Sequence, residues 1–284
     1  MKLFSSIILF LLLFDETIFA QKGNKLQNIV FYPKIEDVFI KVTPEIEATF
    51  IPILSITKEI NGKKKIFHVV SIWDNGKYDK AFFNNYRKKI ELIEFDYQNN
   101  KIDYPTPVVV PNIDCLPRAY RYLQKYFESN KEWLTSCDDK QKSIKNEGQI
   151  KKDIKRFGSQ FRCFSGFSSE IYYRRIVSYL ILKERYLKQG ILNTEFPKYK
   201  FDFKSYISGD YEYFTKNKPP DEIYTDKPLW WQQDEDYIFK DDYKNIVEFI
   251  CQTNSQLGSS DSDTSLKLFY NPKNNKVTLY MEWD

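Results

Sequence analysis

One short stretch of the chain combines the residue types that act on sugars. Trp230 and Trp231 are followed closely by Asp234, Glu235 and Asp236. Exposed indole rings stack on sugar rings, and two carboxyl groups that face each other across a cleft can hydrolyse a glycosidic bond without histidine. The same pattern is typical of two core tryptophans that lead into a helix with an acidic first turn. We favour the core interpretation and keep glycan contact or hydrolysis as the alternative.

A single histidine, His68, limits the other chemistries. A metal site with two histidine ligands is excluded, and a Ser-His or Cys-His nucleophile would have to use His68, for which we expect a structural role in a strand. Ser55 and Lys58 match the Ser-x-x-Lys spacing of penicillin-recognising enzymes, but that pair works on a helix turn and these residues lie in a strand pattern. The residues from Asp261 begin like a calcium-binding loop, but Leu266 stands where such a loop requires glycine.

The sequence also lacks a glycine-rich phosphate loop and a Gly-x-Ser-x-Gly elbow. We therefore expect no cofactor, no metal and no catalytic residue. The sequence leaves open whether the protein is an enzyme, and it favours a protein that is not.

The four cysteines suit disulfides in an exported protein. They allow three pairings, which the sequence cannot choose among. Joining Cys115 to Cys137 would close a short loop and leave Cys163 to pair with Cys251. They are too widely spaced for a zinc knuckle or a thioredoxin-like Cys-x-x-Cys site.

Residues 1–20 predict a signal peptide, with Lys2 before an apolar run from Ile7 to Phe14. An uncleaved anchor is the alternative. Because the sequence has no Asn-x-Ser/Thr acceptor, we expect a bacterial protein, exported to the periplasm or secreted. We expect no membrane span after signal cleavage.

The net charge is only +4, and basic and acidic residues are interspersed along the chain. We therefore expect no nucleic-acid partner. The lysine-rich segment 138–156 predicts a solvated face, or a patch that binds an acidic partner.

Helix and strand patterns predict an α+β fold. The clearest helix, about 168–190, has Ser168 or Ser169 as cap, Glu170 in its first turn and Gly190 at its end. Further helices are expected at 79–90, after Pro117, and at 241–253. Strands are expected at 28–42, either unbroken or with a break at Pro33, and at 53–60, 65–73, 91–97, 197–204, 266–270 and 276–283. Turns are expected at Asn61-Gly62 and 98–100, and the last two strands should form a hairpin.

Part of this layout resembles a known family. The hairpin from Ile56 to Trp73 is followed by Asp79-Lys80-Ala81, which opens a short helix, and by a closing strand from Val108 to Pro111. This order resembles the C-terminal domain of TonB-type energy transducers over residues 53–111. The resemblance implies a periplasmic protein-contact module without catalytic residues. The rest of the chain carries no such likeness.

These patterns divide the chain into a β-rich part with a short helix at 21–112, a mainly helical part at 113–253, and a serine-rich loop with a final hairpin at 254–284. Residues 21–284 are also short enough for one domain. We expect the hairpin to return to the N-terminal sheet, because an isolated hairpin is unstable. The functional hypothesis is a non-catalytic module that binds another envelope protein, with glycan as the alternative ligand.

Overall fold

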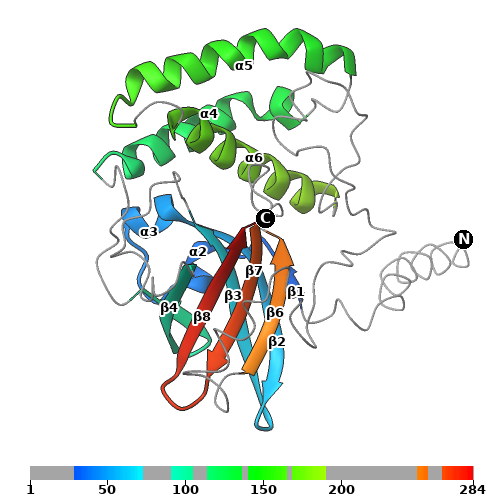
Figure 1. Ribbon diagram of the computed structural model, residues 1–284. Helices are drawn as coiled ribbons and strands as arrows, with labels where there is room; N and C mark the ends of the chain where they lie inside the picture. Colours follow the sequence, from blue (N-terminus) through cyan, green and yellow to red (C-terminus); the bar gives the residue numbers. More distant parts are fainter. Residues whose placement is uncertain are drawn as a thin grey trace, which may run out of the picture.

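The computed structural model describes residues 29–72, 91–104, 114–135, 140–164, 168–189, 248–254 and 264–283. Two antiparallel sheets pack one in front of the other, and three long helices lie across one end of them (Figure 1). This is the expected α+β class. The elements are β1 (Ile29–Phe31), α2 (Ile35–Val38), α3 (Pro44–Thr49), β2 (Phe50–Ile60), β3 (Lys63–Ile72), β4 (Glu91–Gln98), β5 (Lys101–Asp103), α4 (Leu116–Thr135), α5 (Lys140–Gln160), α6 (Ser168–Gln189), β6 (Glu248–Asn254), β7 (Thr264–Asn271) and β8 (Lys276–Trp283).

The first sheet has the strand order β1-β2-β3 and is built on the predicted hairpin. Its turn residues Asn61 and Gly62 have φ angles of 52° and 73°. Two consecutive residues with positive φ make the turn whose twist matches that of antiparallel strands, and asparagine and glycine adopt it at low cost. The Asn61-Gly62 hairpin is confirmed.

The second sheet has the order β5-β4-β8-β7-β6. Asn99 and Asn100, with φ angles of 52° and 61°, turn β4 into β5 as expected. The C-terminal hairpin of β7 and β8 joins β4, where Val277 pairs with Phe95. We expected one N-terminal sheet to receive this hairpin. The hairpin does return to a strand of the N-terminal part, but that part divides between two sheets, and the sheet that contains β4 receives the hairpin.

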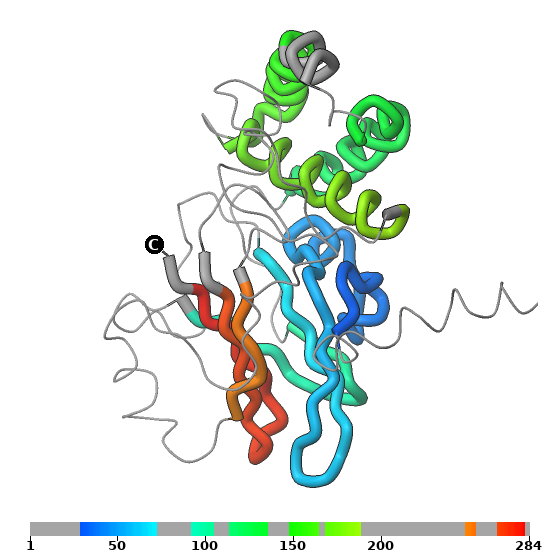
Figure 2. The backbone as a smooth tube through the Cα atoms, turned by 90° about the vertical axis from the view of Figure 1, so that its right-hand side faces the viewer, coloured from blue at the N-terminus to red at the C-terminus, as the bar shows by residue number. Residues whose placement is uncertain are grey.

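The two sheets pack face to face, as the edge-on view shows (Figure 2). Phe67 on β3 lies with its ring centroid 5.2 Å from Tyr97 on β4 and 5.2 Å from Tyr270 on β7. Nearer the helices, Phe50 on β2 lies 5.8 Å from Phe95 on β4. Offset and edge-to-face rings of this kind stabilise a core beyond the apolar area they bury.

The predicted long helix is α6, which lies between the other long helices and the sheets. Glu170 in its first turn pairs with Arg174 one turn later. Its tyrosines point both ways: Tyr173 contacts Phe157 of α5 at 5.7 Å, whereas the Tyr172 hydroxyl donates to the Ala48 carbonyl at 2.9 Å. A helix with apolar residues on both sides is wrapped by other elements. No helix in the described ranges is long and apolar enough to cross a membrane.

Two predicted elements differ in the structure. Within the helix expected at 241–253, residues from Glu248 onward form strand β6, in which Cys251 pairs with Leu268 of β7. A short apolar run suits either a helix or a buried strand, and pairing with β7 decides for the strand. For 28–42 the alternative with a break at Pro33 is the one found, since β1 ends at Phe31, but residues 35–38 beyond the break are helical and not extended. The helix expected at 79–90 and the strand expected at 197–204 lie outside the described residues.

Candidate functional site

A basic pocket of about 470 Å³ lies where the first turns of α4 meet the end of α5. The α4 wall carries cations at helical spacing, since Arg118, Arg121 and Lys125 fall three and four residues apart and share one face. These three side chains are exposed, whereas Ala119 and Leu123 on the opposite face are buried. The lining residues are Arg118, Arg121, Tyr122, Lys125, Gln160, Phe161, Arg162 and Cys163.

The other wall is the turn that ends α5. The Phe161 N–H donates to the Phe157 carbonyl at 2.9 Å, so the helical hydrogen bonding continues to this residue. The Phe161 ring is buried and contacts the rings of Phe157 at 4.8 Å and of Tyr122 at 5.5 Å. This aromatic cluster joins α4 to α5 and holds the exposed Arg162 at the rim of the pocket.

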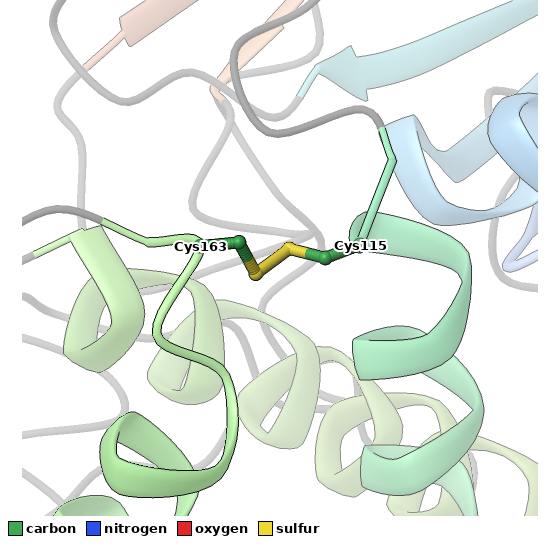
Figure 3. Close-up of a disulfide and its surroundings, with 2 residues drawn as sticks. All are labelled: Cys115 and Cys163. Carbon is green, nitrogen blue, oxygen red and sulfur yellow. A yellow bond between two sulfur atoms is a disulfide. The ribbon is translucent and has the colours of Figure 1, made fainter.

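A disulfide between Cys115 and Cys163 fastens the two walls together (Figure 3). Cys115 directly precedes α4, and Cys163 lies in the turn after α5. The pairing of Cys115 with Cys137 that we considered is wrong. So is the pairing of Cys163 with Cys251, because Cys251 is a buried free thiol on β6 whose pKa burial raises to about 12.

The pocket is strongly positive. Four cationic side chains surround it, and none of its described lining residues is acidic. The Arg121 Nε–H donates to the Pro117 carbonyl at 3.2 Å, which orients that guanidinium along the helix. Guanidinium groups donate several hydrogen bonds in one plane and match the geometry of carboxylates and phosphates. The arrangement is suited to binding an anion, and the rings of Tyr122 and Phe161 add apolar surface beside it.

His68 does not line the pocket, and both of its ring nitrogens form hydrogen bonds. Its Nδ1 is 2.7 Å from Ser55 Oγ, and its Nε2 is 2.7 Å from the Asn100 carbonyl oxygen. A carbonyl can only accept, so Nε2 donates and Nδ1 accepts the Ser55 hydroxyl proton. His68 is 3 % exposed and Ser55 is 7 % exposed. This geometry supports the structural role, because it ties β2 and β3 to the β4–β5 turn.

The Ser-x-x-Lys spacing does not place the Ser55 hydroxyl and the Lys58 amine in one site. Successive side chains of a strand point to opposite faces, so residues three apart do not share one. Lys58 accordingly reaches β6, where its Nζ donates to the Phe249 carbonyl at 2.7 Å, while Ser55 bonds to His68. No group of three or more potential metal ligands gathers within the described ranges.

We expect the stability of the protein to fall as the pH drops below about 6.5. Burial lowers the pKa of His68, and Lys101 lowers it further, against the opposing influence of the Asn100 carbonyl and Asp37. The folded state therefore binds this proton less readily than the unfolded state. Its contribution to stability is complete above the unfolded pKa and is lost as the pH falls through the folded pKa, by at most about 1.4 kcal/mol per pH unit.

Urea unfolding between pH 5 and pH 8 measures this effect. Since His68 is the only histidine, a His68→Gln variant should be less stable at neutral pH but lose less stability on acidification. Equal losses in both proteins between pH 6.5 and pH 5 would contradict the assignment.

The candidate glycan-contact residues Trp230, Trp231, Asp234, Glu235 and Asp236 lie outside the described residues, as does Cys137. Glycan contact therefore stays a prediction.

The basic pocket was not predicted from the sequence. The spacing of Arg118, Arg121 and Lys125 beside Cys115 was a usable signal for its α4 wall, but no local pattern links these residues to Arg162.

Comparisons with known proteins give no family. No protein-family model matches the chain, and no curated protein or solved structure matches it. The resemblance of residues 53–111 to TonB-type C-terminal domains stays a prediction, because its short helix and closing strand lie outside the described residues.

Proposed function

We propose that the chain is a non-catalytic protein-binding module and that its basic pocket holds an acidic segment of the partner. The observation that carries this proposal is the convergence of Arg118, Arg121, Lys125 and Arg162 on one pocket without a lining carboxylate among the described residues. Such a cluster repels itself unless an anion joins it. Aspartate or glutamate side chains satisfy the guanidinium donors, and the apolar parts of the same segment pack against Tyr122 and Phe161.

The proposed compartment is the bacterial envelope or the exterior of the cell. The Cys115–Cys163 disulfide supports it, because such bonds persist in oxidising compartments and are rare in the cytosol. The signal-peptide pattern of residues 1–20 supports it independently. A partner in the same compartment with an exposed acidic segment fits both observations.

Removing two of the pocket cations should weaken binding of an acidic peptide. The probe is a fluorescent peptide of alternating glutamate and serine, with affinity measured by anisotropy. We expect Arg118→Gln/Arg121→Gln to raise the Kd about tenfold or more, since each charge-assisted hydrogen bond contributes about 1.5–3 kcal/mol. Affinity should also fall with added salt, because these side chains are exposed and therefore screened.

The matched control is Lys155→Gln/Arg156→Gln. It removes the same charge from exposed positions of α5 that do not line the pocket. This variant should bind the peptide nearly as well as the unaltered chain. Equal weakening in both variants would show that net charge or the lysine-rich segment 138–156, and not the pocket alone, attracts the peptide, and the proposal would fail.

Site-specific crosslinking in the native host identifies the partner. A photoreactive amino acid at Gln160 places the probe in the pocket, and the same amino acid at Lys155 serves as the control. We expect one protein to be captured from Gln160 and not from Lys155, through a peptide rich in aspartate or glutamate. Co-purification of a glycan without a protein would instead favour the Trp230–Asp236 stretch.

A further inference from the structure

The two sulfurs of the disulfide are in unlike surroundings. Cys163 is exposed and lines the basic pocket, whereas Cys115 does not line it and is only 1 % exposed. Thiol–disulfide exchange proceeds by attack of a thiolate on one sulfur, and access decides which sulfur is attacked. A thiolate that enters the pocket therefore meets Cys163.

Cys115 is placed as the leaving group. Its carbonyl accepts the Ala119 N–H at 2.9 Å, so Cys115 stands at the N-terminus of the 20-residue helix α4. The first N–H groups of a helix have no acceptor within it, and the helix dipole adds positive potential there. A thiolate at a helix N-terminus is stabilised, and a better-stabilised thiolate leaves faster.

The pocket also selects the attacking thiol. Its four cations favour a thiol that carries negative charge, and clefts lined by one sign of charge raise the association rate of the opposite sign. Glutathione represents this class, since its carboxylates outnumber its ammonium group. The Tyr122 and Phe161 rings leave apolar surface for the rest of such a molecule.

We propose that Cys163 is a thiol–disulfide exchange site for anionic thiols of the glutathione class. The thiolate sulfur forms a bond to Cys163 Sγ, the bond between Cys163 Sγ and Cys115 Sγ breaks, and its electron pair leaves with Cys115 Sγ. The Cys115 thiolate remains at the helix N-terminus or takes a proton from water. The products are a mixed disulfide on Cys163 and a reduced Cys115, so one disulfide replaces another and no further oxidant or reductant is required. This exchange uses the basic pocket but does not depend on a protein partner.

The test uses the oxidised full chain with glutathione and with its dimethyl ester, which lacks the carboxylate charges. Reactions are quenched by alkylation, and peptide mapping by mass spectrometry locates the adduct. The rate of each thiol is divided by its rate with bis(2-hydroxyethyl) disulfide, which removes the difference in intrinsic reactivity. We expect the normalised rate of glutathione to be about tenfold higher than that of the ester, to fall with salt, and to give an adduct on Cys163 with Cys115 alkylated.

The variants separate this proposal from peptide binding. Arg118→Gln/Arg121→Gln should lose most of the preference for glutathione, and Lys155→Gln/Arg156→Gln should keep it. Equal normalised rates for the two thiols, an adduct on Cys115, or no adduct on the folded chain would overturn the exchange site. Acidic-peptide binding measured on the same samples is independent, so either proposal can fail while the other stands.

Discussion

Replacing both Cys115 and Cys163 with alanine should lower the free energy of unfolding by about 4 kcal/mol, because the bond closes a loop of 48 residues and restricts the unfolded chain accordingly. In the folded state the bond joins the start of α4 to the turn after α5, the two walls of the basic pocket. Guanidinium unfolding of the oxidised chain and of the double variant, followed by tyrosine and tryptophan fluorescence, measures the difference.

Two controls isolate the covalent bond from the loss of cysteine side chains. Cys251→Ala removes a buried thiol that forms no disulfide, and we expect it to cost only about 1 kcal/mol. A reductant should destabilise the unaltered chain and leave the double variant unchanged. If the double variant were as stable as Cys251→Ala, the disulfide would not restrict the unfolded chain to the extent that its loop length predicts, and the expected loss of stability would be contradicted.

The elements that could be predicted from sequence are those with strong local signals. The Asn61-Gly62 turn specifies its hairpin because few residue pairs accept two positive φ angles in succession. Helix α6 begins at Ser168, one of the two serines predicted at its start, and ends at Gln189, directly before the predicted terminating glycine. In each case the residues that set the structure lie within a few positions of one another.

The features that could not be predicted depend on contacts between distant segments. Strand β6 is a strand because it pairs with β7, and the pattern of its own apolar residues permits a helix equally well. The pairing of Cys115 with Cys163 depends on how α4 and α5 pack, and so does the approach of Arg162 to Arg118. No pattern in the sequence therefore indicated that these four cations, each an exposed residue, would line one pocket.

Replacing Phe67 with alanine should cost about 3–5 kcal/mol, the usual range for removing a large ring from a closely packed core. Phe67 is fully buried on β3 and lies against Tyr97 and Tyr270, which belong to the other sheet. Its ring therefore contributes to the packing of one sheet on the other. Urea unfolding gives the loss of stability, and circular dichroism shows whether the strands persist in the variant.

The neighbouring residue Ile66 provides the matched control. It precedes Phe67 on the same strand, its side chain points to the opposite face, and it is 37 % exposed. Ile66→Ala should cost about 1 kcal/mol, because it removes β-branching and little buried area. If both variants lost equal stability, burial between the sheets would not be what Phe67 contributes. A cost for Phe67→Ala several times larger would show that the two sheets stabilise each other, although the sequence alone suggested a single sheet.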